Sequence, residues 1–340
     1  MKITVNAKAF TKIFRDFVKN RKVMMNFKIT GDILNIELME EYTVCYPIRV
    51  KVDSVDQYTE ISTFLDKTIN VLTEDEDIVI TIAESVINIS QGAFYTTLVK
   101  EYEARREFVD TTSLELKNAY ANRLKYLTHC AVSCMGMAKE LGFSDPDPVF
   151  TGGKFYMDYQ QAFLVEHMEY PECCVTLSIL RDFVYKLDDN AVFAHLPDLS
   201  MLYFRTQFYE FWVPTVNYNI DGNTIAAVNK KMAELVPVTK IKLTDYAQRL
   251  QILTSAFPKK QFTIAIGDGE FNVSITSNTT YATVGNSISK YLLSKHITSA
   301  QLDTVLKLFK DDEEVEILRG GNCLCLQSGE KSMLIAGMIF

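Results

Sequence analysis

The length, composition and charge of this 340-residue chain exclude several classes of protein. Hydrophobic residues make up 48% and charged residues 23% of it, the balance of a globular protein rather than of a disordered or fibrous one. No apolar run approaches the roughly 18 to 20 residues of a transmembrane helix, and no secretory signal follows Met1, so we expect a cytoplasmic protein. Because the net charge is −8, contact with nucleic acid would need lysine and arginine to gather locally.

One pattern occurs three times along the chain: a short amphipathic helix, an acidic turn and an alternating strand. The copies begin at Leu65, Leu180 and Leu302, and the first and third align without a gap. A repeated unit in a chain of this length predicts three domains, each large enough to bury its own core. We place these domains at residues 1–112, 113–226 and 227–340.

Another helix is expected ahead of each copy, at residues 7–19, 114–128 and 243–256, and each is followed by strands with period-2 alternation. In the middle domain the proline-rich stretch 142–148 predicts a surface loop. Each domain would then contain two helix-plus-strand units. The sequence therefore predicts an α+β protein of three tandem, internally doubled domains.

The first expected helix has two faces. Phe10, Ile13 and Phe17 fall on one side and predict a core face. Basic residues follow at spacings of four and three on the other side: Lys8, Lys12, Arg15, Lys19 and Lys22. Most such stripes are solvated surface, but this one is expected to lack acidic neighbours, so its self-repulsion would be relieved by an anion. That favours a surface that binds the phosphates of a polyanion.

The sequence carries no recognisable motif of catalysis or metal binding. The chain has no phosphate-binding loop, dinucleotide fingerprint or nucleophile elbow. The nearest approach to a zinc cluster, His129 and Cys130 with Cys134, lacks a second ligand pair, and buried helix residues are the better interpretation. The seven cysteines form no Cys-x-x-Cys pair and are expected to be reduced. We expect no enzyme, cofactor or metal; the only material for an enzyme would be Asp145, Asp147, Asp158 and His167.

The order and spacing of these units resemble the bacterial DNA polymerase III beta sliding clamp family along the whole chain. The most specific matches are residues 1–5 and 332–340, which resemble the family's first and last strands, with Ala131-Val132-Ser133 and residues 251–255. Two stretches depart from the family. Residues 158–163 stand where it has Thr-Asp-Gly-His-Arg-Leu, and residues 229–232 stand where it has a Phe-Pro-aspartate-like stretch. Together with the chain's shorter length, these departures fit a divergent member from a phage or mobile element.

The resemblance implies a function without chemistry. Two chains would close a ring, with helices inside and a continuous sheet outside, around double-stranded DNA that is bound independently of sequence. DNA polymerase and the clamp loader would bind an apolar cleft through short linear peptides. The alternative is a clamp-fold interaction protein that binds replication or transcription partners without encircling DNA.

The resemblance also assigns three sets of residues. Arg21 and Lys22 resemble a basic loop that touches DNA, which extends the DNA-binding set to Lys8, Lys12, Arg15, Lys19, Arg21 and Lys22. The ring interface would join Ile252 and Leu253 of one chain to Phe94 and Tyr95 of the other. The partner-peptide cleft would be lined by Phe163, Leu235, Pro237, Leu334, Ile335, Met338 and Phe340.

Overall fold

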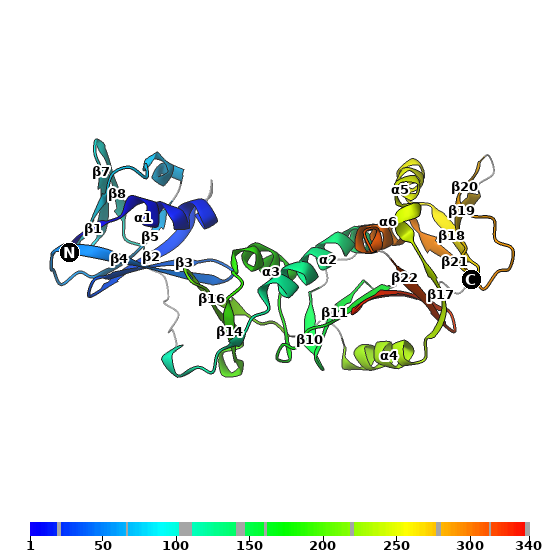
Figure 1. Cartoon of the computed structure of the whole chain (residues 1–340). Coiled ribbons are helices and arrows are strands. Elements are labelled where there is room, and N and C mark those ends of the chain that lie inside the picture. Colours follow the sequence, from blue (N-terminus) through cyan, green and yellow to red (C-terminus); the bar gives the residue numbers. More distant parts are fainter. Residues whose placement is uncertain are drawn as a thin grey trace. The chain divides into compact units, whose positions relative to one another are not determined.

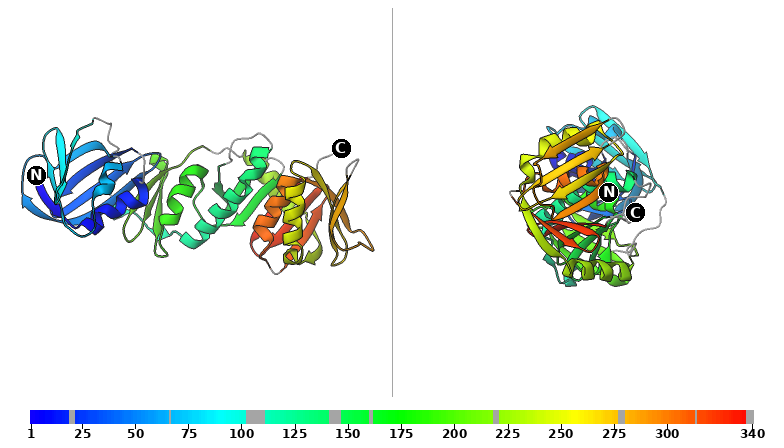
Figure 2. Two further views of the ribbon diagram at one scale, coloured as in Figure 1. Left: turned by 90° about the horizontal axis from the view of Figure 1, so that it is seen from above. Right: turned by 90° about the vertical axis from the view of Figure 1, so that its right-hand side faces the viewer.

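The computed structural model describes residues 1–18, 22–65, 67–101, 111–140, 147–159, 162–217, 221–276, 280–312 and 314–336. These residues form helices and antiparallel sheets, which confirms the α+β class (Figures 1 and 2). The chain divides into two compact units, Met1–Ala121 with Lys186–Pro214, and Asn122–Tyr185 with Thr215–Phe340. The middle third of the chain thus contributes to both units, and the three domain boundaries stay a prediction. No helix among the described residues is long and apolar enough to cross a membrane.

The first unit is built on a 12-stranded sheet in which the long β4 has a central place. β4 pairs with β1 and β3 of its own third of the chain, and with β16 of the middle third through Phe211 and Val44. Gly31, at φ +61°, makes the turn between β2 and β3. The strands are β1 (Lys2–Val5), β2 (Val23–Thr30), β3 (Ile33–Met39), β4 (Thr43–Ser54), β5 (Glu60–Leu65), β6 (Ile78–Ile82), β7 (Val86–Gln91), β8 (Phe94–Val99), β9 (Lys117–Asn118), β14 (Val192–Leu196), β15 (Met201–Arg205) and β16 (Glu210–Pro214).

The first helix begins where predicted but changes its geometry within the predicted span. Asn6 caps α1 (Ala7–Ile13) by accepting a 3.1 Å hydrogen bond from the amide of Ala9. The chain then continues as a π-helical turn, η1 (Phe14–Val18). The rings of Phe10 and Phe27 stack at 6.4 Å and fix α1 over the sheet. The predicted core face is therefore confirmed.

The second unit contains an eight-stranded sheet and a four-stranded sheet. The larger sheet runs in the order β13-β10-β11-β12-β24-β23-β22-β17, and its β12–β24 pair joins the middle third of the chain to the last. The strands are β10 (Val149–Thr151), β11 (Lys154–Asp158), β12 (Ala162–His167), β13 (Cys173–Cys174), β17 (Val236–Ile241), β18 (Gln261–Ile266), β19 (Phe271–Thr276), β20 (Tyr281–Gly285), β21 (Leu293–Thr298), β22 (Val315–Gly320), β23 (Cys323–Ser328) and β24 (Lys331–Ala336).

The longer helices follow the predicted order, but the helix predicted in the first repeat is only the 3-10 turn η2 (Lys67–Val71), and the one predicted from residue 243 begins at Ala247. A third prediction needs correction, and one helix was not predicted. The longer helices are α2 (Ala121–Glu140), α3 (Leu177–Phe183), α4 (Gly222–Ala233), α5 (Ala247–Ala256) and α6 (Ser299–Phe309), with α5 and α6 side by side (Figure 2). The prediction that a helix begins at residue 114 was wrong, because Leu114 and Leu116 pack as alternate residues against the cluster around Trp212. The helix that was not predicted is α4.

Strand register assigns α2 and α4 to opposite faces of the eight-stranded sheet (Figure 1). Arg123 of α2 bonds Glu166, whereas Asn229 of α4 bonds Tyr156. Tyr156 lies opposite Val165 in the β11–β12 ladder, and side chains alternate along a strand, so Tyr156 and Glu166 point to different faces. The sheet therefore has an α2 face and an α4 face.

A buried carboxylate lies on the α2 face where β12 pairs with β24. Glu166 lies opposite Lys331 in the ladder and accepts a 2.8 Å hydrogen bond from Arg123. Arg123 also bonds Glu330 at 2.7 Å, and Lys331 pairs with Asp312 at 2.9 Å. Burial raises the pKa of Glu166 to about 7, with Arg123 and Lys331 opposing the shift and Glu330 and Asp312 adding to it. This junction between two thirds of the chain thus carries a group that titrates near neutral pH.

We expect the stability of the second unit to depend on Glu166 and on pH. A carboxyl group whose pKa is raised on folding stabilises fully below its unfolded pKa, near 4.5, and loses that contribution as the pH rises through about 7. The free energy of unfolding of Glu166→Gln should therefore increase relative to that of wild type as the pH rises from 5 to 8, by up to about 1.4 kcal/mol per pH unit. Thermal melts of both proteins across this range measure the difference. A constant difference would contradict the raised pKa.

Candidate functional sites

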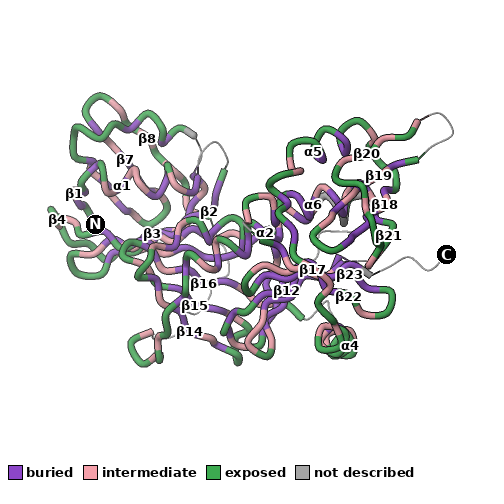
Figure 3. Tube along the Cα trace, turned by 45° about the vertical axis from the view of Figure 1, so that its right-hand side comes forward, coloured by how far each residue is buried: buried purple, intermediate pink, exposed green. Residues whose placement is uncertain are grey.

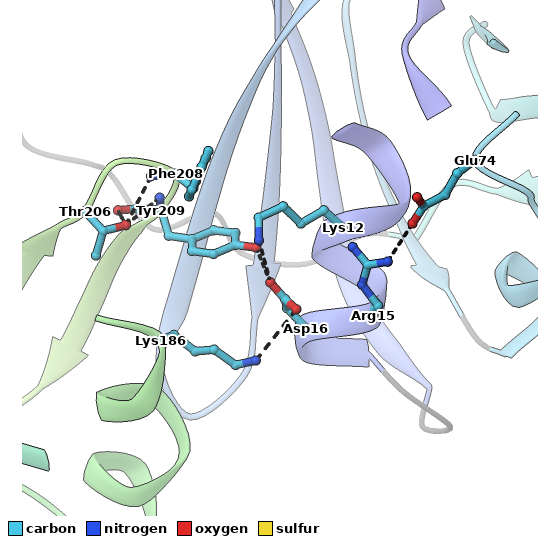
Figure 4. A network of polar contacts seen from close by, with 8 residues as sticks. All are labelled: Lys12, Arg15, Asp16, Glu74, Lys186, Thr206, Phe208 and Tyr209. Carbon is cyan, nitrogen blue, oxygen red and sulfur yellow. Dashed lines mark hydrogen bonds and ion pairs between the residues drawn. The ribbon is translucent and has the colours of Figure 1, made fainter. Parts of the chain in front are cut away.

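The predicted basic stripe is partly neutralised by carboxylates (Figure 4). The ammonium of Lys12 lies 3.1 Å from Asp16, four residues further along the same helical stretch. The Arg15 guanidinium donates a 2.5 Å hydrogen bond to Glu74, and Lys22 lies 4.2 Å from the centre of the Phe64 ring. Lys8 is exposed and has no ion-pair partner among the described residues. Lys19 and Arg21 lie outside the described residues.

The expectation that the stripe lacks acidic neighbours was wrong. Residues 12 and 16 are adjacent on a helical surface, so Asp16 belongs beside the stripe by spacing alone. The contact between Arg15 and Glu74 joins residues far apart in the sequence, which helical spacing does not predict. The stripe is therefore a mixed surface whose cations differ in their availability to an anion.

Asp16 is the centre of a polar cluster that ties the first helical stretch to the β15–β16 hairpin (Figure 4). Its carboxylate accepts a 2.5 Å hydrogen bond from the Tyr209 hydroxyl and lies 3.8 Å from Lys186. The amide of Tyr209 donates to Thr206 at 2.8 Å, which holds the hairpin turn. Partial burial alone would raise the pKa of Asp16, but Tyr209, Lys12 and Lys186 outweigh it and lower that pKa. The carboxylate is thus ionised at neutral pH and holds the hairpin in place.

The predicted cleft residues do not all share one face. Leu334 is buried in an apolar cluster with Tyr156 and Val165, against which Phe163 and Leu235 pack half-buried. Ile335 is fully buried but follows Leu334 in β24, so alternation places it on the α2 face. Pro237 is exposed, and Met338 and Phe340 lie outside the described residues. The structure thus gathers Phe163, Leu235 and Leu334, and separates Ile335 from them.

Helix α4 fills part of this apolar cluster from outside the sheet. Val228 is buried in it, and Ile225 and Met232 pack against it. The side-chain Oδ1 of Asn229 accepts hydrogen bonds from the Tyr156 hydroxyl at 2.9 Å and from Lys154 at 3.3 Å. Sequence reasoning missed α4, although its apolar residues and Leu235 follow the three- and four-residue spacing of an amphipathic helix.

The predicted ring-interface residues occupy exposed and buried positions. β8, which carries Phe94 and Tyr95, is the terminal strand of its sheet, and the Tyr95 side chain is 65% exposed. In α5, Ile252 is 64% exposed whereas Leu253 is buried at 7%. Tyr95 and Ile252 are therefore available to a partner, and Leu253 belongs to the core of its own unit.

Asp147 and Cys130, which the sequence offered as candidates for catalysis or metal binding, have structural roles. Asp147 accepts a 3.0 Å hydrogen bond from the amide of Leu177 at the start of α3. Burial raises the pKa of Cys130 to about 11, which makes it an inert thiol at neutral pH. Asp145 lies outside the described residues. Within the described ranges, no group of three or more histidine, cysteine, aspartate or glutamate side chains is placed to hold a metal ion.

Comparison with solved structures identifies the fold. The chain is similar over 100% of its length, and of theirs, to the beta clamp of Helicobacter pylori bound to a DNA ligase peptide (TM-score 0.72, 10% identity) and to the DNA polymerase III beta subunit of Pseudomonas aeruginosa (0.72, 12%). The DNA polymerase III beta chain of Streptococcus pneumoniae gives 0.70 at 13% identity, again with full coverage. No family model and no curated protein matches the sequence. The chain therefore has the beta-clamp fold, as its sequence resemblance predicted, with a highly divergent sequence.

Removing the charge of Asp16 should loosen the hairpin. We expect Asp16→Asn to cost about 1–2 kcal/mol of stability at pH 7, because hydrogen bonds to charged groups are stronger than neutral ones. A lowered carboxyl pKa stabilises above the unfolded value near 3.8, so the difference from wild type should shrink as the pH falls below that value. Denaturant melts at several pH values measure it.

Tyr209→Phe, which removes only the hydroxyl donor, provides the second arm of a double-mutant cycle. The two substitutions should be strongly non-additive because they remove the same hydrogen bond. Effects that simply add would show that the contact between Asp16 and Tyr209 contributes nothing.

Proposed function

We propose that the chain is a DNA sliding clamp, which encircles duplex DNA as a homodimeric ring and tethers a polymerase and other partners through an apolar cleft. The observation that carries the proposal is the full-length similarity to bacterial beta clamps. Encirclement requires no catalytic group, because a closed ring turns weak, sequence-independent phosphate contacts into long residence.

Two terminal strands support the closure of a ring. β8 ends the sheet of the first unit, and β20 ends the four-stranded sheet of the second. Each exposes a tyrosine, Tyr95 at 65% and Tyr281 at 69%. Edge strands with exposed aromatic side chains are suited to pairing with another chain, so we assign them, with Ile252, to the contact between protomers.

Partner capture is supported by the apolar cluster around Leu334. The Helicobacter pylori clamp was solved with a DNA ligase peptide. Phe163, Leu235 and Leu334 offer this chain an apolar surface for a short peptide with leucine or phenylalanine anchors. We assign the cleft to these residues, with Pro237 at its exposed margin and Met338 and Phe340 as further proposed members.

A second candidate function is a clamp-fold scaffold that binds replication or transcription partners without encircling DNA. The observation that favours it is the pairing of Lys12 with Asp16 and of Arg15 with Glu74. These contacts reduce the positive charge of the helix that we propose to face DNA. Oligomeric state and DNA binding separate the two candidates.

Ring closure predicts a dimer of twice the 38.7 kDa chain mass in solution. Ile252→Asp should give a folded monomer at micromolar concentration, since a carboxylate buried at an interface without a partner is costly. Leu253 is unsuitable for this test because it is buried within its own unit. Light scattering with size-exclusion chromatography measures the mass, and Gln251→Asp, at an exposed neighbouring position, should remain dimeric. A wild-type monomer would exclude the ring.

DNA contact predicts weaker binding when exposed cations on the helix side are reversed. The double variant Lys8→Glu, Lys22→Glu should lower duplex affinity and flatten its salt dependence by about 0.9 log units per log unit of salt for each phosphate that is no longer neutralised. Arg49→Glu with Lys51→Glu, on exposed β4 positions, makes the same charge change and should have less effect. Fluorescence anisotropy at several salt concentrations gives the slopes. Equal reductions in affinity for both double variants would assign binding to net charge alone.

A further inference from the structure

The apolar surface proposed for partner peptides is already covered by a segment of this chain. On the α4 face of the eight-stranded sheet, Phe163, Val165 and Leu334 come from the two strands that join the middle and last thirds. Ile225, Val228 and Met232 of α4 pack on the same cluster. The occupant of this surface is therefore a helix of the chain itself.

The attachment of α4 is slight for a 12-residue helix. Val228 is its only buried residue, and the rest of the helix is exposed or half-buried (Figure 3). Asn229 supplies the polar contact to the sheet, through Tyr156 and Lys154. The N-cap residue Asp221 makes no side-chain capping bond. A helix held by one buried side chain, two half-buried side chains and one amide belongs to the less stable part of a structure, which opens locally.

We propose that α4 is an internal cover of the partner-peptide surface, and that a partner peptide binds by displacing it. This inference rests on the proposed function, because it concerns access to the cleft assigned there. Peptide and α4 would compete for the same apolar positions. The apparent affinity for a peptide is then reduced by the fraction of molecules in which α4 is detached.

The contacts of α4 also specify what the displacing peptide must present. Its apolar anchors have to fill the positions of Val228 and Met232 against the cluster. The Tyr156 hydroxyl, on a side chain only 2% exposed, and Lys154 both donate to the oxygen of Asn229. A buried donor left without an acceptor is costly, so the peptide must bring an acceptor to this point. The fitting partner is a short peptide with two apolar anchors and an amide or carboxylate side chain.

The experiment compares peptide binding by the full chain and by variants in which α4 is loosened. The probe is a fluorescent synthetic peptide that carries glutamine, leucine and phenylalanine. Val228→Asp places a carboxylate in the apolar cluster, whereas the control Ala227→Asp makes the same change on the exposed side of α4. If α4 is attached in about nine molecules of ten, Val228→Asp should bind about tenfold more tightly, and Ala227→Asp should match wild type.

Two further measurements keep the outcome decisive. Asn229→Ala removes the polar contact without burying a charge, and it should also bind the peptide more tightly than wild type. This variant provides the test if Val228→Asp fails to fold. Hydrogen exchange of the wild type should increase in residues 222–233 when the peptide is added, because displacement exposes their amides. Equal affinities for all folded variants, with no added exchange in α4, would overturn the cover but leave peptide capture intact. Absence of binding by every variant would reject peptide capture itself, and the cover with it.

Discussion

The structure depends on two antiparallel ladders that cross from one third of the chain to the next. β16 pairs with β4 in the first unit, and β12 pairs with β24 in the second. Buried backbone amides and carbonyls need partners, and without these ladders each third would expose unpaired strand edges. The sheets therefore continue from one third of the chain into the next, and the middle third is shared between two units.

The register of the β12–β24 ladder also determines which side chains lie on the same face of the sheet. It pairs Phe163 with Leu334 and Glu166 with Lys331. The first pair belongs to the α4 face, and the second to the α2 face, because strand side chains alternate. One ladder thus supports the proposed peptide surface on one side and a carboxylate with a pKa of about 7 on the other. Glu166 and Leu334 therefore lie in the same ladder, on opposite faces of the sheet.

The sequence predicted what is local and missed what is distant. The core face of α1 and the C-terminal end of α5 follow from apolar spacing, so both were predictable. The prediction that a helix begins at residue 114 was wrong because two apolar residues, Leu114 and Leu116, fit the start of a helix as well as an alternating segment. The contacts of Asp16 with Tyr209 and of Arg15 with Glu74 join distant residues, which no spacing rule could supply. The amphipathic spacing of α4 is present in the sequence, so this helix was predictable although it was not predicted.

The ion pairs of the basic stripe are of two kinds. Some cations could exchange their carboxylate partner for a phosphate, whereas others could not do so without weakening a structural contact. The ion pair of Arg15 with Glu74 is exposed on both sides, and such pairs contribute only about 0–1 kcal/mol. A phosphate could replace Glu74 at little cost. Lys12 and Lys186 share the more buried Asp16, whose carboxylate also holds the hairpin through Tyr209, so withdrawing either lysine would weaken a structural contact. On a chain of net charge −8, the proposed phosphate-binding surface is then narrower than the stripe suggests and, among the described residues, centres on Lys8, Arg15 and Lys22. Few and weak contacts would suit the proposed sliding ring, because strong ones would hold it in place on DNA.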